Sequence, residues 1–165
     1  MKMLNNLEYI SYSIYFNKYS WNQLIFNAVA PFLKSIEHDK LFENFMFFKN
    51  SIRGENVSIV FKSNPSSNAL LDQKIKHYFE EYLHKNPSPD NNGISANEWF
   101  SNYSNNSIHN NDFTLRRKVI QGHTGGKHLF PAINEHLASS SEIAIDLLQT
   151  YQNSTQEEII NRVTK

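Results

Sequence analysis

A pair of glycines between a basic run and a helical run is the feature of this chain best suited to chemistry. Within residues 115–148, His123 and Thr124 stand directly before Gly125 and Gly126. Glycines let the backbone approach a ligand closely, and backbone N–H groups beside cations suit an anion. His123 is a candidate acid or base because an imidazole changes charge near neutral pH. A histidine that only caps a turn explains the same pattern.

Three cations stand together shortly before this turn: Arg116, Arg117 and Lys118. If the run is a strand, Arg116 and Lys118 share one face and Arg117 points to the other. A pair of cations facing a ligand and a solvated sheet face both fit this alternation.

Three more cations flank two apolar stretches near the middle of the chain. Lys49 follows an apolar run, Arg53 lies in a short connection with Gly54, and Lys62 ends the next apolar run. Each suits the binding of a carboxylate, and each also fits a solvated strand end or loop.

Other reactive constellations have little support. His123, His128 and His136 match no compact metal-binding motif, and the chain has no cysteine, so we predict no metal and no cofactor. The serines at 139–141 lack the Gly-x-Ser-x-Gly setting of a nucleophile, and helix capping explains them.

Composition narrows the classes of partner. The 165 residues predict a single domain, 1–165. Lysine plus arginine equals aspartate plus glutamate at 16 each, which argues against nucleic acid as a partner. No stretch approaches the length of apolar sequence that spans a membrane, so we expect no membrane insertion and a cytoplasmic location.

The pattern of apolar residues predicts an α+β fold. We expect strands at 8–16, 45–48, 57–61 and 113–120, a helix from Ser20 disturbed by Pro31, and a helix from Asn68 to Lys85. Residues 86–112 read as a loop-rich insertion with one docked turn. The order is βαββαβ, a ferredoxin-like core with an antiparallel sheet.

Additional helices are expected at the C-terminal end. Pro131 suits the first turn of a short helix, and Ser139 with Glu142 forms a capping-box pattern before a second one. Ser154 with Glu157 repeats this pattern before a third.

Three blocks of the sequence resemble one biosynthetic family. They are YISYSIYF with NQLIFNAVAPFLKSI, the pair FMFFKN and NVSIVFK, and HTGGKHLFPAINEHLASSSEIAIDLL. Together they resemble the C-terminal elimination domain of class I lanthipeptide dehydratases and the related stand-alone proteins of thiopeptide-type bacteriocin biosynthesis. Such domains are usually longer, and their C-terminal portion, with a functional histidine, has no counterpart here.

The resemblance implies a chemistry and a set of positions. In the family, basic residues on paired central strands recognise a glutamyl group on serine or threonine, and glutamate is eliminated; the thiopeptide relatives form a pyridine ring. Lys49 matches an arginine of the family, and His123 matches the arginine before its Gly-Gly turn. The family's strand histidine and two arginines fall at or near Asn56, Ser58 and Val60, so much of the cationic set is absent.

The resemblance implies a function in the biosynthesis of a ribosomally made, modified peptide. We expect a subunit that binds the precursor peptide or a larger modification enzyme, and an open sheet edge would accept an extended peptide. The enzymatic alternative is a lyase-type elimination or a cyclisation by Lys49, Arg53 and His123. Substrate contacts are then expected from Lys62, Arg116, Arg117, Gly125 and Gly126. A homodimer and a generic α+β interaction module with the same fold remain open.

Overall fold

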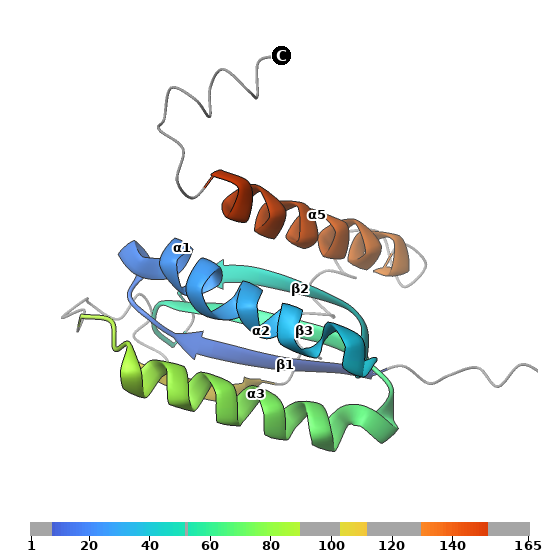
Figure 1. Ribbon diagram of the computed structural model, residues 1–165, viewed down its shortest axis with the longest axis horizontal. Coiled ribbons are helices and arrows are strands. Elements are labelled where there is room, and N and C mark those ends of the chain that lie inside the picture. The colour runs from blue at the N-terminus through green and yellow to red at the C-terminus, as the bar shows by residue number, and fades with distance from the viewer. Residues whose placement is uncertain (1–7, 52, 90–102, 112–129, 152–165) are drawn as a thin grey trace, which may run out of the picture.

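A computed structural model describes residues 8–51, 53–89, 103–111 and 130–151. Four strands form one antiparallel sheet in the order β2-β3-β1-β4. The strands are β1 (Glu8–Tyr15), β2 (Phe42–Asn50), β3 (Asn56–Ser63) and β4 (Ser107–Asn111). The helices between them complete the βαββαβ order, so the expected ferredoxin-like α+β fold is confirmed (Figure 1).

The first helical run joins β1 to β2 and consists of five short helical segments. They are η1 (Lys18–Ser20), α1 (Trp21–Leu24), the π-helical η2 (Ile25–Val29), α2 (Ala30–Ile36) and η3 (Glu37–Asp39). Asn17, rather than the expected Ser20, caps the start by accepting a bond from the Tyr19 N–H at 2.9 Å. The π turn ends two residues before Pro31, where a missing N–H and a bulky ring disturb regular α-helical bonding.

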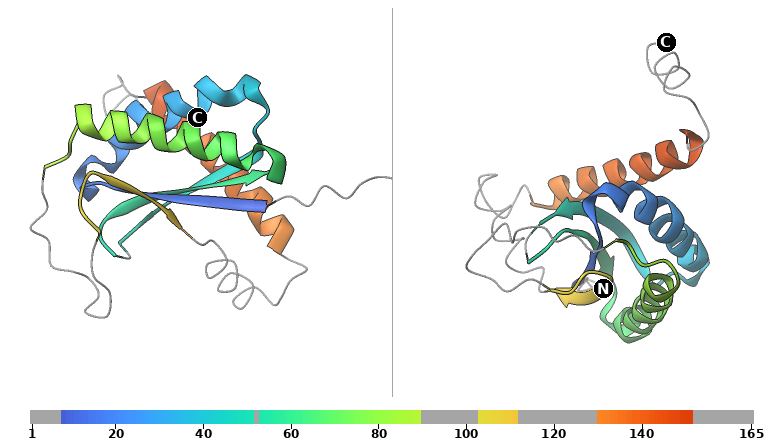
Figure 2. Two further views of the ribbon diagram at one scale, coloured as in Figure 1. Left: turned by 90° about the horizontal axis from the view of Figure 1, so that it is seen from below. Right: turned by 90° about the vertical axis from the view of Figure 1, so that its left-hand side faces the viewer.

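Helix α3 (Pro65–Lys85) lies beside this run on the same side of the sheet (Figure 2). Asn64 is its N-cap, four residues before the expected Asn68, because Pro65 suits the first helical position. Its end at Lys85 is as predicted. Leu71, Ile75, Phe79 and Leu83 form its buried stripe.

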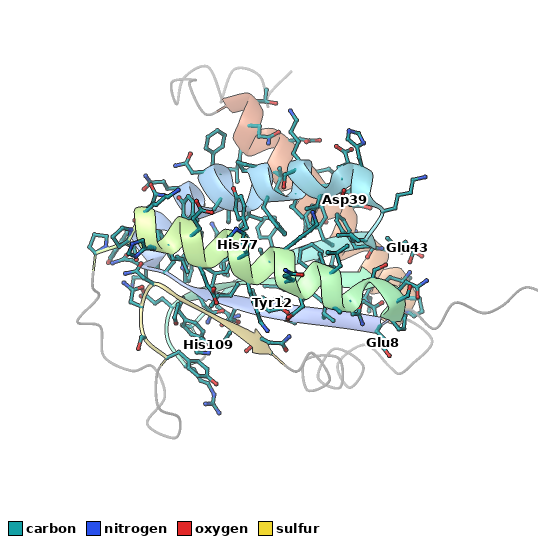
Figure 3. The ribbon with its side chains drawn as sticks, turned by 60° about the horizontal axis from the view of Figure 1, so that its bottom comes forward. Glu8, Tyr12, Asp39, Glu43, His77 and His109 are labelled. Atoms are coloured by element: carbon teal, nitrogen blue, oxygen red, sulfur yellow. The ribbon has the colours of Figure 1, made fainter. Side chains whose placement is uncertain are left out.

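The main core lies between these helices and one face of the sheet, which we call the helical face. Strands β1 and β3 contribute Tyr12, Ile14, Val57, Ile59 and Phe61, each no more than 1% exposed. The Tyr12 hydroxyl donates a hydrogen bond to Asp72 of α3, which satisfies the polar atom of an otherwise apolar layer. Figure 3 shows Tyr12 between β1 and α3.

Helix α5 (Phe130–Tyr151) is a single helix, not the short helix followed by a capped second helix that the sequence suggested. Ser139 therefore lies in its interior, and the expected capping box is wrong. The helix crosses the β2 edge from one side of the sheet to the other (Figure 2). Ile145 packs in the main core, whereas Leu137 packs with Met46 and Val60 on the opposite face.

The last core strand differs from the sequence prediction. The structure places β4 at 107–111, inside the stretch interpreted as a loop, while the predicted strand at 113–120 lies outside the described residues. Strand β4 pairs with the central strand β1, and the N–H of Asn106 donates to the Tyr15 carbonyl at 2.8 Å. Pairing and the packing of Ile108 override the weak strand propensity of asparagine.

Candidate functional site

Much of the face of the sheet opposite the main core is polar, and several of its serine and asparagine side chains on the central strands are buried. Cross-strand neighbours on this face are Asn50, Asn56, Tyr15 and Ser107 in one row and Phe48, Ser58, Ser13 and His109 in the next. Ser11, Val60, Met46 and Asn111 form a third row. We call this surface, with these twelve residues, the polar face.

Hydrogen bonds between side chains join all four strands across the polar face. Ser13 and Ser58 share a bond of 2.8 Å, and Asn111 of β4 donates to Ser13. Asn50 of β2 donates to the Ser58 hydroxyl at 2.8 Å, and Asn56 donates to Asn50 at 2.7 Å. Ser13, Ser58 and Asn56 are at most 5% exposed. Hydroxyls and amides that would be costly to bury alone are thus paired with one another.

An aromatic cluster with two basic groups lies at the β4 end of the polar face. The rings of Tyr103 and His109 are stacked with centroids 3.9 Å apart, and Tyr15 lies 5.1 Å from Tyr103. The guanidinium of Arg53 lies over the Tyr103 ring at 5.4 Å. Ser107 contacts His109 Nε2 at 3.1 Å. We call Arg53, Tyr103, His109 and Tyr15 the rim cluster; Figure 3 shows its His109 on the side of β4 away from α3.

The tight turn between β2 and β3 makes the rim cluster possible. Arg53 has a φ of 58° and Gly54 a φ of 115°. A Cβ on Gly54 would lie 3.3 Å from the Tyr15 ring, so glycine is required both by conformation and by space. The Arg53 carbonyl accepts a bond from the Tyr103 N–H at 2.8 Å, which ties the turn to the segment before β4.

The Tyr15 hydroxyl is a hydrogen-bond donor rather than a base. Burial, and to a smaller extent the nearby Tyr103, raise the pKa of Tyr15 to about 12. Its phenol therefore stays protonated at neutral pH. In this cluster the groups able to accept a proton or hold an anion are the imidazole of His109 and the guanidinium of Arg53.

The structure separates the cations that the sequence offered as site residues. Lys49 pairs with Val57 on the helical side, and its Nζ donates to Asn22 of α1 at 2.6 Å. Arg53 belongs to the rim cluster. Lys62 forms a 2.5 Å ion pair with Glu43 at the far end of the sheet. Figure 3 shows Glu43 at the end opposite His109. Lys49 and Arg53 are therefore directed to different faces.

The other predicted site residues lie outside the described residues. These are His123, Gly125 and Gly126 of the turn, with Arg116 and Arg117 before it. Their roles stay predictions. In the part of the chain that the structure describes, no group of three or more histidines and carboxylates is placed to hold a metal ion.

The sequence does not single out Tyr103 and His109 as site residues. Both fall in the Asn- and Ser-rich stretch for which the sequence predicts a loop, and neither has a motif around it. One signal in the sequence is Ile108, because an apolar residue flanked on both sides by polar residues fits a short strand with one side chain directed towards the core.

A groove of about 600 Å³ runs beside the rim cluster, between α3 and the outer edge of β4. Its α3 wall contains Glu80, Leu83 and His84, and its floor is formed by residues 106–109. Among the described strands, β4 lies at the edge of the sheet. The groove therefore gives access to a strand edge that borders the polar face.

The fold and this arrangement define a ferredoxin-like α+β protein with a polar sheet face. Neither a family model nor a curated protein matches the sequence. Among solved structures, the chain is similar to the pyridine synthase TbtD from thiomuracin biosynthesis, with a TM-score of 0.67 and 15% identity. The similarity covers 92% of this chain but 51% of that one, so the chain spans about half the length of its structural neighbour. At this identity the likeness shows a shared fold.

No helix in the described part of the chain is both long and apolar enough to cross a membrane.

Proposed function

We propose that this protein binds a ribosomally made precursor peptide during its modification and does not itself eliminate glutamate from it. The fold shared with a pyridine synthase of thiomuracin biosynthesis supports a role in this area of chemistry. It agrees with the sequence resemblance to thiopeptide-type biosynthesis proteins. The binding surface that we propose is the rim cluster and the adjoining edge of β4.

The proposal that the protein does not eliminate glutamate rests on the bonding and burial of Asn56, Ser58 and Val60. At these positions the resemblance leads us to expect basic residues that hold the departing glutamate. Here Asn56 and Ser58 bond to each other at 3.0 Å, and Val60 is 1% exposed and packs against Met46. A developing carboxylate needs cations or donors directed at it, and these three side chains provide no cation.

A set of short synthetic peptides, each with one O-glutamylated serine in a varied sequence, tests this proposal. We expect saturable binding by calorimetry to at least one member and no change in peptide mass after prolonged incubation. Release of glutamate with formation of dehydroalanine would show an elimination enzyme. A set in which no peptide binds would contradict the proposal altogether.

A lyase or cyclisation activity is the second candidate, and the rim cluster is the observation that favours it. His109 is a candidate base, Arg53 a candidate anion holder and Tyr15 a donor. The same incubation distinguishes it, because an activity of this kind changes the peptide mass and is lost in His109→Gln. In a binding protein, His109→Gln leaves the mass trace as it was.

A further inference from the structure

The two edges of the sheet differ in whether they can accept another strand. Helix α5 lies against β2, and the Phe47 N–H of that edge donates to the Ser141 hydroxyl at 3.2 Å. Strand β4 has no neighbour on its outer side among the described strands. Outward N–H and C=O groups of an edge strand are a template for an extended chain.

The groove along β4 also has a charge that a ligand can match. Glu80 lies in the α3 wall, and no ion pair joins it to a cation of the described residues, whereas Glu81 beside it pairs with Lys85 at 2.5 Å. A cationic side chain lying along β4 would complement Glu80. This charge favours a peptide with lysine or arginine over an acidic one.

We propose that an extended segment of the precursor peptide adds as a fifth strand to β4, with a lysine or arginine directed at Glu80. This inference rests on the proposed function and gives it a position and a sequence preference. Side chains of a strand point alternately to its two faces. A residue next to the cation in the peptide therefore points to the polar face, beside His109 of the rim cluster.

The alternation fixes a spacing in the ligand. The residue numbers of the modified serine and the cationic residue must differ by an odd number, for example one or three, so that one side chain reaches the rim cluster and the other reaches Glu80. An even separation would direct both to the same side of the sheet.

Backbone pairing is tested with two N-methylated versions of a peptide that binds the unchanged protein. One carries methyl groups on odd-numbered amides and the other on even-numbered amides. We expect one version to bind at least about tenfold more weakly, because it loses several backbone hydrogen bonds, and the other to bind nearly as well as the parent. Equal affinities of the two versions would overturn strand addition.

The charge contact is tested with Glu80→Gln and the matched control Glu81→Gln, each against a lysine peptide and its norleucine analogue. We expect Glu80→Gln to weaken binding of the lysine peptide by about two- to five-fold and to leave the norleucine peptide unaffected. Glu81→Gln should change neither affinity. Equal effects of the two substitutions would overturn the contact with Glu80.

These outcomes separate the two proposals. If peptides bind but methylation and Glu80→Gln have no selective effect, the β4 edge is not the binding surface, and only the proposal that the protein binds a precursor peptide stands. If no peptide binds, the proposed function itself is contradicted.

Discussion

The two faces of the sheet are built on the same central strands but with different chemistry. On the helical face, β1 and β3 contribute apolar or aromatic side chains to a core covered by α1, α2 and α3. On the polar face, the alternate residues of the same strands are serine, asparagine and tyrosine, apart from Val60, and hydrogen bonds join Ser13, Ser58 and Asn56. The helical face thus supplies stability through apolar burial, while the polar face positions side chains through a shared hydrogen-bond network.

The largest expected effect is on the helical face. Phe79→Ala should lower the free energy of unfolding by about 3–5 kcal/mol, because the ring is fully buried and its loss leaves a cavity. Leu70→Ala on the same helix is the control, since Leu70 is 47% exposed and should lose little. Urea unfolding measures both. Equal losses of unfolding free energy in the two variants would show that Phe79 is not packed in the main core.

On the polar face, Ser58→Ala should lower the free energy of unfolding by about 1–3 kcal/mol, because its buried partner Ser13 and its half-buried partner Asn50 lose a hydrogen bond. The double variant Ser13→Ala with Ser58→Ala should lose less than the sum of the single variants. Strict additivity in urea unfolding would contradict a shared network.

A smaller effect is expected where α5 meets the β2 edge. Ser141→Ala should lower the free energy of unfolding by about 1 kcal/mol, because the Phe47 N–H loses its acceptor. Ser140→Ala, one position away and exposed, should stay within about 0.5 kcal/mol of the unchanged protein. Urea unfolding that gives both variants the same stability would show that this contact does not hold α5 to the edge.

The last expected effect is absent at neutral pH and concerns alkaline pH at the junction of the polar face and the rim cluster. The folded pKa of Tyr15, about 12, lies above its ordinary value of 10.0, so between these values the folded state binds more protons than the unfolded state. The contribution of Tyr15 to the free energy of unfolding is therefore fully present below pH 10 and declines as the pH rises towards 12. Tyr15→Phe should flatten this decline in urea unfolding. Burial also raises the pKa of Tyr78 and Tyr82, so part of the decline remains.

If the unfolding free energies of Tyr15→Phe and the unchanged protein fall in parallel over this range, Tyr15 is not buried as described.

Much of the fold could be predicted from the sequence because its core elements have regular apolar periodicity. The alternation of Ile10, Tyr12 and Ile14 predicts a strand, and the stripe of Leu71, Ile75 and Phe79 predicts a helix. The fourth strand could not be placed because SIHNN has one apolar residue, and its strand state depends on pairing with β1. Helix α5 passes through three serines that suggest a cap, and packing against β2 overrides that local preference.

The candidate site was less predictable because its residues come together only in the folded chain. Arg53 was a candidate from the sequence, and the structure adds Tyr103 and His109 to it, although 50 or more positions separate the latter two from Arg53. Lys49 looked equivalent to Arg53 in the sequence. Successive residues of a strand point to opposite faces, so Lys49 is directed towards α1 whereas the next residue, Asn50, lies on the polar face.

Amide chemical-shift mapping with a glutamylated peptide that binds tests most directly whether the polar face and the β4 edge recognise the peptide. We predict that the largest shifts are at Ser13, Ser107, His109 and Asn111, with small shifts at the outward residues of α1 and α2. Shifts concentrated on α1 and α2, with β4 unaffected, would contradict the account.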